Sequence, residues 1–239
     1  MGIHYDFSFD FIAMVTGFLA WCVIGIIAYR MYKKQAVKPK VWKVLVSILV
    51  GLFSFSINLN WFDTLVKLSI LPLGVWILYG FLKGKEGRWQ TYRPFAWLGF
   101  FANYIFLAAT LLAIPTHHWV YPENELSTYL SNTENASIIN THSSALDRSL
   151  NKESLLKQIH NMKQEPINSE EWYQKTYMEP DIKKINERFP YQLTETSSKW
   201  GSGLEIIIYV EADGKGLLVT TPKRQFYFRS VESLLKGGN

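Results

Sequence analysis

Hydrophobic and polar positions divide the chain into two unlike halves. Up to Thr116, long apolar runs alternate with short charged clusters, and beyond it polar residues become frequent. A helix rises about 1.5 Å per residue, so about 20 apolar residues cross the roughly 30 Å of hydrocarbon in a bilayer. We predict four such crossings, over residues 9–29, 41–59, 62–82 and 94–114. Residues 1–116 are therefore expected to form a four-helix transmembrane domain.

The charges around these runs predict their orientation. Asp6 and Asp10 precede the first run and basic residues follow it, which is the reverse of a cleavable secretory signal. We expect this segment to remain as an anchor with its N-terminus outside. The loops over residues 30–43 and 83–93 are rich in Lys and Arg, and such loops stay in the cytoplasm. An even number of crossings then places everything after Thr116 outside, in a multi-pass protein of the cell membrane.

The polar half begins with a segment that has little periodicity. Residues 117–144 are rich in Asn, Ser and Thr and are expected to be a linker. Residues 145–164 then place apolar side chains at helical spacing, which predicts an amphipathic helix. Start and stop signals mark two shorter helices, over residues 169–177 and 180–190.

The last part of the chain has the composition of strands. Apolar segments rich in β-branched and aromatic residues are separated by short turns, which is typical of an antiparallel meander. We predict strands over residues 204–211, 216–221 and 225–231, with residues 191–195 as an edge strand. The fold class is therefore a membrane α-helical bundle followed by a small extracytoplasmic α+β domain over residues 145–239.

The positive net charge belongs to the membrane half. Residues up to Thr116 include eleven Lys and Arg and four Asp and Glu, whereas the remainder includes 14 basic and 16 acidic residues. A nucleic-acid-binding domain would carry a basic surface, so we expect no nucleic-acid partner for the slightly acidic outer half. The single cysteine, Cys22, lies inside an apolar run, so neither an intrachain disulfide nor a thiolate zinc site is expected.

Four polar residues lie in or beside the apolar runs and are candidates for an ion or proton site. Asp63 and Lys67 have the four-residue spacing of a helical ion pair, and Asn58 precedes them. The alternative is an interfacial pair in which the Lys67 ammonium reaches toward water. Asn103 lies deeper in the fourth run, where an amide serves either a ligand or, more commonly, a hydrogen bond between helices.

Known catalytic motifs are absent from the sequence, including the phosphate-binding loop, the dinucleotide fingerprint, the HExxH zinc motif and the nucleophile elbow. His117 and His118, with His4, are the remaining candidates for a metal or pH-sensing site, because histidine is the commonest metal ligand and titrates near neutrality. Polar residues beside a membrane interface need no such role. We expect no catalytic residues and no cofactor.

Four aromatic residues of the outer half are candidates for recognition of a peptide or glycan. They are Trp172, Tyr173, Tyr177 and Trp200. A domain of this size also needs large aromatic side chains for its core, so burial is the competing interpretation.

These patterns favour a membrane-anchored interaction or regulatory protein. Its outer domain is expected to bind a protein partner in the envelope or in a membrane complex. The alternative is a small transporter, channel or accessory subunit that uses the polar groups at the outer mouth of the bundle. Four helices enclose only a thin pathway, so this alternative requires a homo-oligomer. A membrane-embedded enzyme is the third class, and the sequence contains no motif that favours it.

Overall fold

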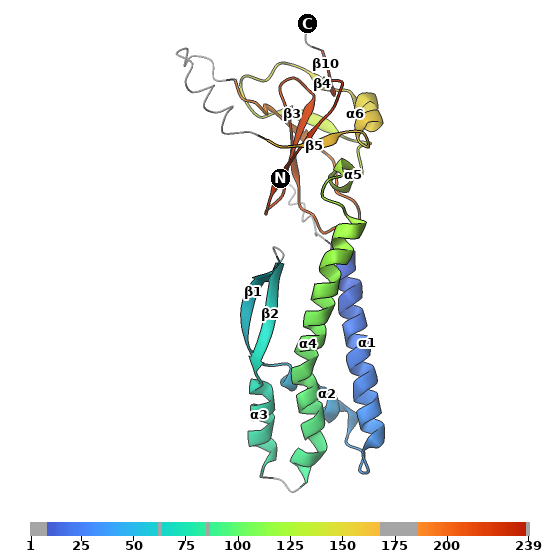
Figure 1. Cartoon of the computed structure of the whole chain (residues 1–239), viewed down its shortest axis with the longest axis vertical. Coiled ribbons are helices and arrows are strands. Elements are labelled where there is room, and N and C mark those ends of the chain that lie inside the picture. Colours follow the sequence, from blue (N-terminus) through green and yellow to red (C-terminus); the bar gives the residue numbers. More distant parts are fainter. Residues whose placement is uncertain (1–8, 62–63, 85–86, 168–185, 238–239) are drawn as a thin grey trace. The chain divides into compact units, whose positions relative to one another are not determined.

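The computed structural model describes residues 9–61, 64–84, 87–167 and 186–237. The chain divides into two compact units (Figure 1). One consists of Ile12–His117 and is called the helical unit below. The other consists of Met1–Phe11 together with His118–Asn239 and is called the sheet unit.

In the described ranges, two helices are long and apolar enough to cross a membrane, judged by length and composition. Helix α1 (Phe11–Lys34) has 24 residues and helix α4 (Arg88–Val120) has 33. At about 1.5 Å per residue they measure roughly 36 Å and 50 Å. Large apolar side chains remain uncovered on both, for example Phe18 and Leu112, each 66% exposed. Because so much exposed apolar surface is unfavourable in water, these helices support association with a membrane.

The structure corrects the expected second and third crossings. Helices α2 (Val41–Gly51) and α3 (Leu73–Leu82) have only 11 and 10 residues, about half of what a bilayer requires. Between them the chain forms an antiparallel hairpin of β1 (Phe55–Trp61) and β2 (Thr64–Leu71). The prediction of four long helices is thus supported for two.

The physical reason is a change of period. From Phe55 to Trp61 apolar and polar residues alternate strictly as FSINLNW, and a period of two places all the apolar side chains on one face of a strand. On a helix the same sequence would place Asn58 on the side opposite to Ser56 and Asn60. Pro72 then separates β2 from α3, consistent with its lack of a backbone donor.

Short helix α2 packs closely on α4 through glycine. A Cβ atom on Gly51 would overlap the carbonyl oxygen of Ala96, and one on Gly99 would overlap the carbonyl oxygen of Ile48. Small residues allow this approach of backbones, which is the usual means of helix association in lipid. The neighbouring core consists of Ile24, Val44, Ile48, Tyr92, Phe95, Leu98 and Ala102.

The sheet unit is built on one six-stranded antiparallel sheet in the order β3-β6-β7-β8-β9-β5. The expected meander is confirmed as β7 (Ile207–Val210), β8 (Gly216–Thr220) and β9 (Gln225–Arg229). Strand β6 (Tyr191–Thr194) is internal, not at an edge, because β3 (Ser137–Asn140) pairs with its other side.

Two further expectations for this unit differ from the structure. Residues 117–144 do not form a bare linker, because they contain β3 and the short helix α5 (Leu126–Tyr129), whose Leu126 and Tyr129 are buried in the core. The long helix expected over residues 145–164 is reduced to α6 (Lys152–Gln158). It begins at Asn151, whose side chain accepts a hydrogen bond from the Ser154 amide, as helix-capping residues do.

Short strands flank α6 on both sides. Strand β4 (Ser149–Leu150) pairs with β10 (Leu235–Lys236). Among the residues that the structure describes, β5 (Lys163–Glu165) forms the outer edge of the large sheet beside β9. The core beneath the sheet includes Leu130, Leu155, Ile208, Val210, Leu217, Val219, Phe228 and Leu234. The helix expected over residues 169–177 lies outside the described residues. So does the first part of the helix expected over residues 180–190, and its described part, residues 186–190, is not helical.

Candidate functional site

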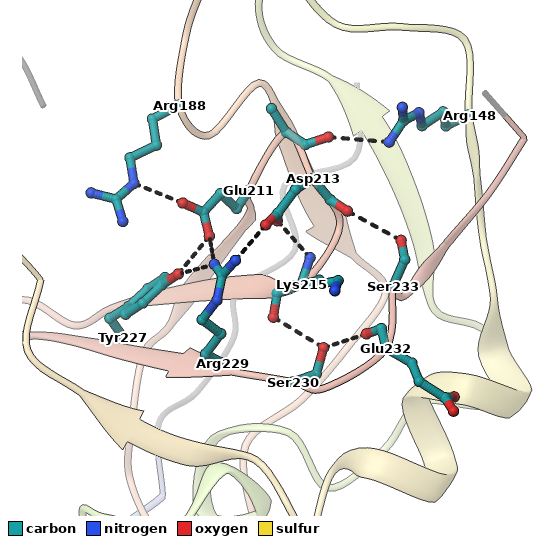
Figure 2. Close-up of polar contacts among 11 residues, drawn as sticks. Arg148, Arg188, Glu211, Asp213, Lys215, Tyr227, Arg229, Ser230, Glu232 and Ser233 are labelled. Carbon is teal, nitrogen blue, oxygen red and sulfur yellow. Dashed lines mark hydrogen bonds and ion pairs between the residues drawn. The ribbon is translucent and has the colours of Figure 1, made fainter. Parts of the chain in front are cut away.

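A charged network lies at one end of the strands β7, β8 and β9 (Figure 2). Glu211 directly follows β7, and its amide donates to the Gly216 carbonyl oxygen at 2.8 Å, which closes the turn between β7 and β8. Gly214 occupies this turn with φ +75°, a conformation that side chains other than glycine rarely adopt. The register pairs Gly216 with Arg229, so the end of β9 lies next to the turn.

The carboxylate of Glu211 is at the centre of this network. It accepts from Arg188 Nε at 2.8 Å, from Arg229 Nη1 at 2.6 Å and from the Tyr227 hydroxyl at 2.5 Å. Arg229 Nη2 also donates to Asp213 at 2.6 Å. The Glu211 side chain is only 12% exposed, whereas Asp213 is 41% exposed. The network therefore has a buried acceptor and a solvent-facing rim.

Two arginines and two carboxylates balance in charge, which makes this a preorganised surface without an unpaired ion. Burial, the largest single effect, lowers the pKa of Arg188, but the hydrogen bonds and charges of Glu211 and Tyr227 together outweigh it, so the pKa is raised. The hydrogen bond with Tyr227 and the neighbouring Asp213 raise the pKa of Arg229. Both guanidinium groups therefore remain charged, and the planar group of Arg188 stacks over Phe189 and Tyr227.

Tyr227→Phe is expected to make the free energy of unfolding less dependent on pH in the alkaline range. Burial and the hydrogen bond to Glu211 raise the pKa of the Tyr227 hydroxyl above its ordinary value of 10.0. A raised pKa means that the folded state favours the protonated form, so this contribution to stability is complete below pH 10 and is lost as the pH rises through the higher value. We expect the free energy of unfolding of the natural chain to fall more steeply than that of the variant between about pH 9 and pH 11. Parallel curves from denaturant titrations at these pH values would contradict this assignment.

A polar groove lies beside the edge strand β5. Its walls come from residues 124–127, at the start of α5, and from residues 159–160 and 162–166, which include all of β5. Its volume is about 760 Å³. Lys163, Gln164 and Glu165 are all exposed, and the register pairs Lys163 with Arg229 and Glu165 with Tyr227. Because directly paired residues share a face of a sheet, Lys163 and Glu165 extend the charged face of the network toward the groove.

Of the predicted polar residues of the membrane half, the structure brings Asn58 and Lys67 together. Asn58 and Lys67 are cross-strand partners in the hairpin, and both are exposed. Asn103 donates to the carbonyl oxygens of Leu52 at 3.2 Å and Phe100 at 3.0 Å, which is the interhelical role weighed for it. Asp63 lies outside the described residues.

The predicted histidines lie near the end of α4. His118 Nδ1 is 3.6 Å from Glu123 Oε1, and both side chains are well exposed. Within the described part of the chain, no group of three or more His, Cys, Asp and Glu residues is arranged to hold a metal ion. His4 lies outside that part.

Of the predicted recognition aromatics, only Trp200 can be located. It is 73% exposed, and its ring centroid is 5.4 Å from that of Phe11 and 5.9 Å from that of Phe9. The Phe11 amide donates to the Gly201 carbonyl oxygen at 2.9 Å, so Trp200 belongs to a junction with the N-terminal segment. Trp172, Tyr173 and Tyr177 lie outside the described residues.

Reasoning from the sequence did not identify the charged network. Glu211 and Asp213 border an Asp-Gly turn and Arg229 closes a strand, so each taken singly is an ordinary surface residue. Only the register between β8 and β9 shows that Arg229 lies next to the end of β7, where Glu211 is located. Pairing the three predicted strands across both of their turns was the signal that could have placed Glu211 and Arg229 together.

The chain was compared with protein-family models, curated proteins and solved structures, and nothing in any of the three matches it.

Proposed function

We propose that this chain is a membrane-anchored interaction protein whose outer sheet unit binds an extended segment of an envelope or membrane-complex partner. The observation that carries the proposal is the groove beside β5. An edge strand has one row of backbone donors and acceptors that its own sheet does not use, and an added strand can pair with it. The groove provides room next to that edge for the side chains of such a segment.

The charges around the groove suit a partner that is polar and mixed in charge. Lys163 and Glu165 on β5 face in the direction of the network, and Glu125 and His160 contribute to the walls. The network itself fixes β9, against which β5 pairs, through Tyr227 and Arg229. A rigid supporting strand reduces the entropy lost when a partner segment becomes ordered on it.

Anchoring follows from the two long helices. Helices α1 and α4 would hold the sheet unit at the membrane surface, and the basic loops over residues 30–43 and 83–93 favour the cytoplasm. The sheet unit would then lie outside the cell membrane, where its groove is open to partners of the envelope.

A photoreactive phenylalanine analogue at Gln164 of the full-length chain is expected to capture a discrete partner in intact cells. The matched control is the same analogue at Ile139, which is 48% exposed on β3 at the opposite edge of the same sheet. Adding Lys163→Glu to the Gln164 probe should reduce capture by about tenfold, because a reversed charge beside the contact opposes a complementary partner. Equal capture at both edges, or no capture at Gln164 from a correctly inserted chain, would contradict the groove as the binding site.

A further inference from the structure

The hairpin of β1 and β2 has two chemically different faces. The register pairs Ile57 with Leu68 and Leu59 with Val66 on one face. On the other face lie the polar side chains of Ser56, Asn58, Asn60, Lys67 and Ser69, with Leu65, 75% exposed, as the apolar exception near the turn. Alternation of apolar and polar faces is the pattern of strands that separate lipid from water.

Hydrogen bonds to α4 fix the level at which the hairpin begins. Asn103 Nδ2 donates to the Leu52 carbonyl oxygen at 3.2 Å, and the Tyr104 hydroxyl donates to the Ser69 carbonyl oxygen at 2.7 Å. Asn103 lies ten residues beyond Arg93, or about 15 Å along the helix, which is half of the hydrocarbon thickness. Within the helical unit the strands then run beside the later half of α4 (Figure 1). Seven residues of strand extend about 23 Å.

A hairpin at this depth cannot face lipid on all sides. In the described part of the chain its sheet consists of β1 and β2 alone, so each strand has an outer edge that no other strand covers. Every unpaired backbone group in hydrocarbon costs several kcal/mol, and open sheet edges exposed to lipid are not tolerated there. Asn58 and Lys67 are exposed on the polar face, which adds a further penalty in lipid.

We propose that the hairpin pairs edge to edge with the hairpin of a second copy of this chain. This inference rests on the membrane anchoring in the proposed function, but not on the groove beside β5. A second copy in the same membrane holds its hairpin at the same depth and in the same orientation, so β1 of one copy can pair antiparallel with β2 of the next and continue both the apolar and the polar surface. The outcome is a homo-oligomer with a β-sheet in the outer half of the membrane, whose Ser, Asn and Lys side chains line a hydrophilic surface.

Single cysteines in the full-length chain test this arrangement. Cys22 is the sole cysteine, so Cys22→Ser provides the background. Cysteine would be placed singly at Ile57, Asn58, Leu59 and Asn60 on β1 and at Leu65, Val66, Lys67 and Leu68 on β2. Because β1 of one copy would lie beside β2 of the next, each β1 variant is co-expressed with each β2 variant under a different tag. Opposed residues of antiparallel strands lie about 4.5–5.5 Å apart at Cα, which is within disulfide range, so mild oxidation in membranes should give mixed dimers from at least one combination of a β1 and a β2 position. Phe81 on α3 is 79% exposed, and Phe81→Cys is the control that should remain monomeric.

Labelling of the same variants gives a second readout. A membrane-impermeant maleimide reacts with the thiolate, which forms in water, so Asn58→Cys and Asn60→Cys should label at least about tenfold faster than Ile57→Cys and Leu59→Cys. The absence of strand dimers, dimers formed equally well through Phe81→Cys, or uniform labelling along β1 would each overturn the proposal. If alkaline carbonate releases the chain from membranes, the anchoring common to both proposals fails; if the chain stays embedded, the cysteine results bear on the hairpin alone.

Discussion

Glu211→Gln is expected to lower the free energy of unfolding of the sheet unit by about 3 kcal/mol, since it removes the charge that two arginines share. The Glu211 side chain is 12% exposed and Arg188 is 18% exposed, so water can replace little of the lost interaction. Glutamine preserves the shape of the side chain but replaces one acceptor oxygen with an NH2 donor, so the substitution removes both the charge and one acceptor. In the full-length chain in detergent micelles, the urea midpoint for proteolytic cleavage of the sheet unit should fall by about 1–2 M.

Asp213→Asn is the matched control for this experiment. Asp213 pairs with the same Arg229 at 2.6 Å, but its side chain is 41% exposed. An exposed pair contributes about 1 kcal/mol or less, and asparagine can still accept the hydrogen bond from the Lys215 amide. If Asp213→Asn destabilises the sheet unit as much as Glu211→Gln, burial of the central carboxylate is not what makes the network strong.

The contrast between these two acids shows what the sequence could and could not predict. Glu211 and Asp213 are two residues apart beside one turn, and nothing local distinguishes their roles. The difference arises from Arg188, which precedes β6, and from Tyr227 and Arg229 on β9. Contacts between residues so distant in the chain depend on register, whereas composition and periodicity are local properties. The strands themselves were predictable because their signal is local.

In the membrane half, the high mean hydropathy of two segments concealed a local alternation of apolar and polar residues. The long runs of α1 and α4 were identified by hydropathy alone. Residues 41–59 and 62–82 have a mean hydropathy similar to that of α1 and α4. However, the polar residues Ser56, Asn58 and Asn60 occupy every second position, which is the period of a strand. Length and hydropathy cannot distinguish a crossing helix from a short helix followed by an amphipathic strand. Periodicity can, and it should have outweighed length at this position.

Gly99→Ala is expected to destabilise the helical unit by about 3 kcal/mol, at the upper end of the usual range for overpacking. A Cβ atom there would overlap the Ile48 carbonyl oxygen and would lie 2.9 Å from the Cα atom of Gly51. These are backbone atoms, which cannot move aside as the end of a flexible side chain can. Helix α2 must therefore shift away from α4, and the hydrogen bond from Asn103 to the Leu52 carbonyl oxygen should be lost with it.

Gly25→Ala on α1 provides the control, since nothing lies within 4 Å of a Cβ atom at that position. Alanine has the higher helix propensity, so this variant should be neutral or more stable by up to about 1 kcal/mol. Both effects are measured by thermal unfolding of the two full-length variants in the same detergent, monitored as the fraction of protein that remains monodisperse. Opposite signs for two identical substitutions in long apolar helices would show that backbone contact between α2 and α4, and not helix propensity, holds α2 in place. Equal effects would mean that α2 can leave α4 without cost, and the hairpin would then lose the support that fixes its depth beside α4.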